Sequence, residues 1–94
     1  MNTEVTEEKL QKYFSITKEA LDAATAAEKT NEEQAADFLD MASRYYADAN
    51  HFKEQGDHVL ALAALNYAHG WLDAGARIGL FKVKDSRLFT VDDE

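Results

Sequence analysis

The chain has 94 residues, of which 46% are hydrophobic and 30% charged, and it contains neither cysteine nor proline. A chain this short builds a single domain, and the missing cysteines exclude a disulfide scaffold, a cysteine nucleophile and thiolate metal ligands. Its net charge of −8 at pH 7 repels phosphate backbones and anionic lipids, so we expect neither nucleic acid nor a membrane among its partners.

The first predicted element is an amphipathic helix over residues 6–29. The residues of its apolar stripe recur every three or four positions, which is the period of a helix. They are Leu10, Tyr13, Phe14, Thr17, Ala20, Leu21, Ala24 and Ala27. Thr30 and Asn31 interrupt the pattern, so the helix is expected to end before them.

A second helix is predicted over residues 32–55. Asn31 is a favourable N-cap residue, and Gln34 occupies the position that completes a capping box. The apolar stripe of this helix consists of Ala35, Phe38, Leu39, Ala42, Tyr45, Tyr46, Ala49 and Phe52. Gly56 is predicted to end the helix with a positive φ, and Asp57 is predicted to cap the next one.

The third predicted helix, over residues 58–79, is apolar around most of its circumference. A seam of small residues runs along it, formed by Ala61, Ala64, Ala68, Gly75 and Gly79. Larger residues flank the seam, with Leu60, Tyr67, Trp71 and Ile78 on one side and Leu65 and Leu72 on the other. A small-residue groove between two ridges allows a helix to contact two neighbours at once, so we expect this helix to be the most buried.

The last segment, residues 80–94, is predicted to be a short extended tail, forming either a small hairpin or an arm that lies on the end of the helices. We expect Phe81 and Leu88 to close the bottom of the core. Short connections place successive helices antiparallel. The predicted fold is therefore all-α, an up-down-up antiparallel three-helix bundle in one domain.

One run of the third helix resembles a known family. The sequence there reads Tyr67-Ala68-His69-Gly70-Trp71-Leu72-Asp73-Ala74-Gly75, with Gly56-Asp57 before it and Gly79-Leu80-Phe81 after it. This signature, built on Gly56, Asp57, Tyr67, Trp71, Gly75 and Gly79, is similar to that of the small archaeal proteins grouped as domain of unknown function 357. The resemblance implies an archaeal, cytoplasmic, uncharacterised protein with a short three-helix bundle. The family has no established activity, so the resemblance offers no catalytic residues to carry over.

The polar side of the third helix is the best candidate for an interaction site. Steps of three and four residues place four side chains on one narrow strip, and these are Asn66, His69, Asp73 and Arg77. His69 with Asp73 suits a metal ion or a proton transfer, whereas Arg77 suits a carboxylate or a phosphate. The alternative is a solvated face, on which an Asp73–Arg77 pair contributes a few tenths of a kcal/mol.

Catalytic motifs are not found in the sequence. It has no glycine-rich phosphate loop, no Gly-x-Ser-x-Gly and no His-Glu-x-x-His, and its single Asp48-x-x-His51 pair lies on a polar face. We therefore expect no enzymatic activity, no cofactor and no metal. The leading hypothesis is a helical interaction module that binds another protein or itself. The alternative is a domain for small-ligand binding or accessory catalysis that uses the strip of the third helix.

Overall fold

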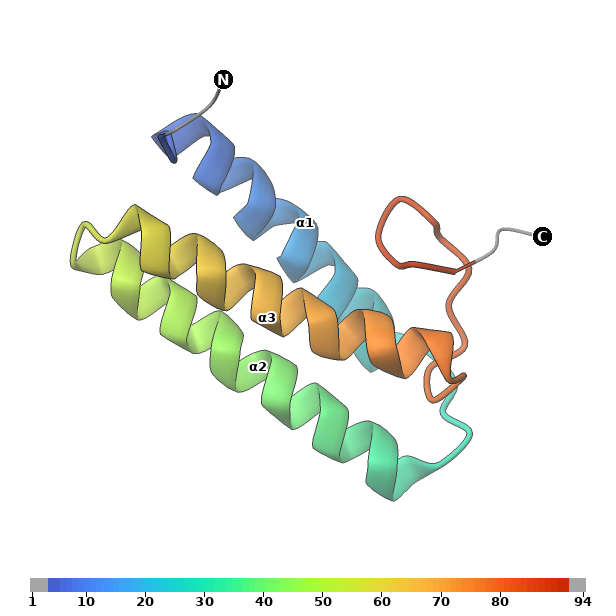
Figure 1. Cartoon of the computed structure of the whole chain (residues 1–94). Coiled ribbons are helices and arrows are strands. Elements are labelled where there is room, and N and C mark those ends of the chain that lie inside the picture. The colour runs from blue at the N-terminus through green and yellow to red at the C-terminus, as the bar shows by residue number, and fades with distance from the viewer. Residues whose placement is uncertain (1–3, 92–94) are drawn as a thin grey trace.

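The computed structural model describes residues 4–91 and contains three α-helices. They are α1 (Glu7–Ala26), α2 (Glu32–Glu54) and α3 (His58–Arg77). In Figure 1, α2 runs antiparallel beside α3, while α1 runs in the direction of α3 and packs mainly against it. This arrangement confirms the all-α, up-down-up bundle that the helix patterns and short connections predict.

Each helix begins at a side chain that caps its first turn. Asn31 Oδ1 accepts a hydrogen bond from the Gln34 N–H at 3.0 Å, and Asp57 Oδ1 accepts one from the Leu60 N–H at 3.0 Å. Thr6 caps α1 in the same way. These bonds satisfy amide groups that have no partner inside a helix, and they confirm the two caps expected from the sequence.

Glycines with positive φ end α2 and α3. Gly56 has φ +77° and Gly79 has φ +78°. After α2 the Asp57 N–H donates to the Phe52 carbonyl at 2.9 Å, and after α3 the Leu80 N–H donates to the Gly75 carbonyl at 2.8 Å. Both ends are Schellman motifs. Gly56 therefore behaves as predicted, whereas Gly79 lies outside the helix, and α3 ends at Arg77 instead of residue 79.

The first helix is shorter than the predicted 6–29, because it ends at Ala26. The chain beyond it is extended and pairs with the tail. The Thr30 N–H donates to the Leu80 carbonyl at 3.2 Å, and the Lys82 N–H donates to the Glu28 carbonyl at 2.9 Å. Hydrophobic periodicity is a local signal. It therefore does not show that residues after Ala26 form hydrogen bonds with a segment about fifty residues away in place of a further helical turn.

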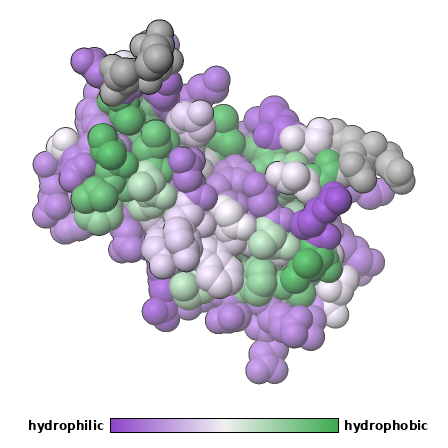
Figure 2. All heavy atoms as spheres, in the orientation of Figure 1, coloured by the Kyte–Doolittle hydropathy of each residue, from purple (hydrophilic) through white to green (hydrophobic). Residues whose placement is uncertain are grey.

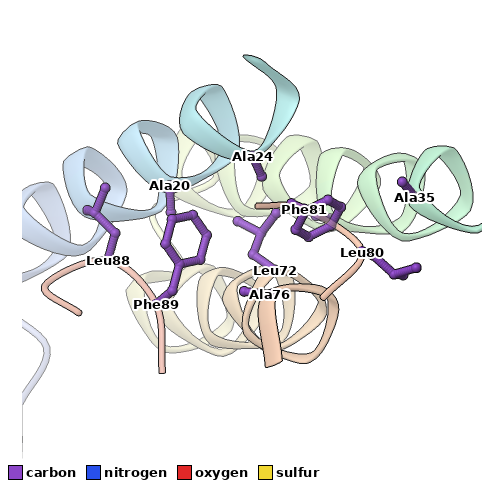
Figure 3. Packing of buried hydrophobic residues seen from close by; sticks show 10 residues of the cluster. Ala20, Ala24, Ala35, Leu72, Ala76, Leu80, Phe81, Leu88 and Phe89 are labelled. Atoms are coloured by element: carbon purple, nitrogen blue, oxygen red, sulfur yellow. The ribbon is translucent and has the colours of Figure 1, made fainter. Parts of the chain in front are cut away.

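The tail folds back over the bundle and forms no hairpin within the part of the chain that the structure describes. It turns at Asp85, whose carbonyl accepts hydrogen bonds from the Leu88 and Phe89 amides, each at 3.0 Å. Phe81 and Leu88 are buried, as predicted, and so is Phe89. Figure 3 shows Leu88 and Phe89 between α1 and α3. Residues 92–94 of the predicted tail lie outside the described residues.

The core consists of two clusters along the bundle. The larger one joins the three helices to the tail and contains Ala20, Ala24, Ala35, Ala42, Leu72, Ala76, Leu80, Phe81, Leu88 and Phe89 (Figure 3). The smaller one, at the other end, contains Leu10, Phe14, Ala49, Ala61, Ala64 and Leu65. In both clusters alanines let the helices approach closely. The small-residue seam of α3 is buried, as predicted, at Ala61, Ala64, Ala68 and Gly75.

The larger ridge beside that seam is not buried as expected. Leu60, Tyr67 and Ile78 are 45%, 56% and 65% exposed, respectively. We call these three residues the apolar ridge. They lie on the side of α3 that borders α2, and α2 alone is too narrow to cover them. The apolar excess of the third helix therefore reaches the surface.

Candidate functional site

The structure divides the predicted strip of α3 into two parts. Asn66 and Arg77 are exposed, while His69 and Asp73 are partly buried beneath the tail. The imidazole Nε2 of His69 donates a hydrogen bond to the Leu88 carbonyl at 2.5 Å. Its Nδ1 lies 3.4 Å from the hydroxyl of Thr17, a side chain on α1 that is only 2% exposed. His69 thereby joins α1, α3 and the tail.

Asp73 also holds the tail. Its Oδ1 accepts a hydrogen bond from the Thr90 N–H at 2.9 Å and lies 4.0 Å from His69 Nε2. The tail is fixed on the α1 side by Arg87, which donates to Glu19, and this bond raises the pKa of the guanidinium. Two of the four predicted strip residues thus have partners within the chain, and these contacts position residues 87–90.

Arg77 has no salt-bridge partner among residues 4–91, so the Asp73–Arg77 pair of the solvated-face alternative is not formed there. Its side chain borders a hollow of about 450 Å³ together with His69, Asp73, Arg87 and Thr90. This hollow is polar and open, and its cations are opposed by Asp73 and by the Glu19 partner of Arg87. The arrangement can hold a small anion, but the His69 imidazole is not available to it, because its Nε2 is hydrogen-bonded to the Leu88 carbonyl of the tail.

Replacing His69 with alanine should lower the free energy of unfolding by about 1–3 kcal/mol, because the Leu88 carbonyl and the buried Thr17 hydroxyl would both lose a partner. The matched variant Arg77→Ala removes an exposed side chain of the same strip and should change stability by less than about 0.5 kcal/mol. Urea denaturation followed by circular dichroism measures both. Equal losses in the two variants would contradict the role given to His69.

The described residues include no group of three or more histidine or carboxylate side chains that could hold a metal ion. Nor does this part of the chain contain a helix long and apolar enough to cross a membrane.

A second surface lies where α3 meets α2 on the side away from the tail. A cavity of about 390 Å³ opens there, lined by Phe38, Tyr67, Gly70, Trp71 and Ala74. We call it the α2–α3 groove. None of these residues is charged. The cavity is therefore apolar and already formed, as binding sites for hydrophobic partners usually are.

Aromatic contacts hold the walls of the α2–α3 groove in place. Phe38 packs edge-on against Trp71, with ring centroids 5.1 Å apart and an interplanar angle of 90°. Tyr45 lies against Tyr67, with centroids 4.3 Å apart. Such pairs favour one ring arrangement. The indole Nε1 of Trp71 is buried and has no hydrogen-bond partner among the described residues.

The groove and the apolar ridge form one continuous surface along α3. On this face of the helix, the residues exposed between the three ridge residues include the small ones Ala63, Gly70 and Ala74. Figure 2 shows green and near-white residues over α3 and its border with α2, edged by purple ones. The sequence pattern showed the wide apolar arc and the ridge within it, and it predicted the third helix to be the most buried. It does not give how much of that arc a neighbouring helix covers.

Comparison with known proteins gives one match. The model of the family described as "Protein of unknown function (DUF357)" matches residues 12–81. The matched region begins within α1 and ends at Phe81, so it includes both walls of the groove. No curated protein and no solved structure is significantly similar to the chain.

Proposed function

This chain belongs to the DUF357 family, whose description leaves the function open, and we propose from its surface that it is a non-enzymatic module that binds another protein at the α2–α3 groove. The apolar ridge carries this proposal, because Leu60, Tyr67 and Ile78 stay exposed in a row beside a preformed apolar cavity. A single exposed leucine needs no explanation, but a contiguous apolar surface rimmed by polar residues marks an interaction site.

The groove has the properties of the central part of a protein interface. Tyrosine and tryptophan contribute much of the binding free energy at such interfaces, because they offer large contact areas and lose little conformational entropy. Tyr67 and Trp71 are both held by neighbouring rings. A partner therefore meets a surface that needs little ordering, which favours binding.

The proposal is tested by co-purification from the source organism with two matched double variants. Tyr67→Ala/Ile78→Ala removes most of the apolar ridge, and Asn66→Ala/Arg77→Ala removes the exposed half of the polar strip. All four side chains are exposed, so both variants should keep the wild-type fold. We expect the ridge variant to lose the co-purifying protein by about tenfold or more, and the strip variant to retain it.

A second candidate function is binding of a small anion in the hollow beside the tail. It is favoured by Arg77, which has no salt-bridge partner among residues 4–91 and borders that hollow with Arg87 and Thr90. It predicts the opposite result, in which Asn66→Ala/Arg77→Ala loses binding and the ridge variant keeps it. That result would contradict the groove as the site of function.

A further inference from the structure

Resting on the proposed function, we infer that the partner occupies the α2–α3 groove with an amphipathic α-helix whose edge beside α2 carries lysine or arginine. The juxtaposition behind this inference is an apolar helix face with small residues at its centre, next to an α2 edge with two carboxylates that have no partner among residues 4–91.

The shape of the surface fits a helix. The apolar ridge runs from Leu60 in α3 to Ile78, the C-cap residue of that helix, a distance of about 27 Å at the rise of an α-helix. Gly70 lies near the middle of this row, and a Cβ built on it meets no atom within 4 Å. Ala63 and Ala74 are also small and exposed. Small residues at the centre of a helix face allow a second helix to pack closely against it.

The backbone of the surface also favours a helix over an extended segment. Both walls of the groove are α-helices, whose amide and carbonyl groups are already used in their own hydrogen bonds. An extended peptide on this face would lose water from its backbone without gaining partners, and that costs free energy. A helix satisfies its backbone internally and presents only side chains, as in the helix-in-groove mode of recognition.

The charges at the α2 edge specify the polar residues of that helix. Met41 lies three residues after Phe38 and four before Tyr45, on the groove side of α2. Asp37 and Asp48 lie four residues before and seven residues after Met41, so helical spacing places both beside the groove. Both aspartates are exposed, and neither has a partner among residues 4–91. Between them, Arg44 is neutralised by Asp40, with Nε and Oδ2 2.9 Å apart. The edge therefore carries two free negative charges, which attract a basic helix.

Net charge disfavours a second copy of this chain as the occupant. Each copy carries a net charge of −8 at pH 7, so two copies repel each other during encounter. A basic helix is instead attracted to the acidic chain as a whole as well as to the α2 edge. Electrostatic complementarity of this kind sets specificity and association rate.

The test uses two synthetic helical peptides of about 18 residues, the length of the apolar row. They share one leucine and alanine stripe, and their flanking positions carry lysine in one peptide and glutamate in the other. Trp71 is the only tryptophan in the chain and lines the groove, so its fluorescence reports binding. We expect the lysine peptide to bind at least about tenfold more tightly, and the advantage to shrink as salt is raised.

A matched pair of variants locates the charge effect. Asp37→Asn/Asp48→Asn should lower the lysine-to-glutamate preference severalfold. Glu8→Gln/Asp22→Asn removes two carboxylates from α1 and should leave the preference within about twofold, because these groups lie outside the groove and are screened. Equal effects of the two variants would overturn the assignment to the α2 edge.

The remaining outcomes separate this inference from the proposed function. Equal binding of both peptides, or tighter binding of the glutamate peptide, would overturn the basic helix and leave docking at the groove intact. No binding of either peptide would overturn the helical occupant, and the proposed function would then be decided by the co-purification experiment. A Trp71 response to neutral phosphatidylcholine vesicles alone would overturn both, since it would show that the surface binds lipid.

Discussion

Replacing Phe81 with alanine should lower the free energy of unfolding by about 3–5 kcal/mol, the usual cost of removing a buried aromatic ring. The side chain is only 1% exposed and lies in the larger core cluster, against the seam of α3 (Figure 3). The loss is a large part of the roughly 5–15 kcal/mol that stabilises a typical domain. Urea denaturation, followed by circular dichroism, measures it.

Ile78→Ala is the matched control for this variant. It also shortens a large apolar side chain near the end of α3, but Ile78 is 65% exposed. We expect it to cost less than about 0.5–1 kcal/mol, since little apolar area returns to water. Similar losses at both positions would show that the apolar ridge is part of the core, which would contradict its assignment as a docking surface.

Gly75→Ala and Gly70→Ala should change stability in opposite directions, although both glycines lie inside α3. A Cβ on Gly75 would overlap the Phe81 ring, whereas a Cβ on Gly70 meets nothing within 4 Å. Overpacking at Gly75 should cost about 1–3 kcal/mol. At Gly70 the better helix propensity of alanine should stabilise the protein by about 0.5–1 kcal/mol. Thermal and urea denaturation compare the two variants.

The cause of the Gly75 effect is tested by combining it with Phe81→Ala. In that background the ring is gone, so Gly75→Ala should be neutral or stabilising. The coupling between the two substitutions should reach about 1–3 kcal/mol. Additive losses would contradict a direct contact between the ring and the glycine.

Local patterns predict the helices of this fold well. The caps at Asn31 and Asp57, the turn at Gly56 and the buried alanines of α3 depend on residues within one or two turns of each other. The early end of α1 depends instead on hydrogen bonds to the tail, such as that from Lys82 to the Glu28 carbonyl. A long-range contact of that kind leaves no periodic signal in the first helix.

The candidate site was predicted less completely than the fold. Spacing placed His69 and Asp73 correctly on one face of the third helix, but it could not show that the tail would come to lie on them. The apolar ridge was recognised as apolar, yet its exposure depends on how many helices are available to cover it. In a bundle of three helices the ridge of Leu65 and Leu72 is buried, but the apolar ridge on the other side of the seam stays exposed. Only the three-dimensional structure shows which of the two is covered.

The most direct test of the groove as the docking surface is a nuclear magnetic resonance titration of the isotope-labelled full chain with the lysine peptide. Chemical-shift changes should concentrate on the residues that form the ridge and the walls of the groove, which are Phe38, Tyr45, Leu60, Tyr67, Gly70, Trp71, Ala74 and Ile78. The tail should shift little, because it lies across the other side of α3. Changes centred on residues 82–91 and on His69 and Asp73 would contradict the account.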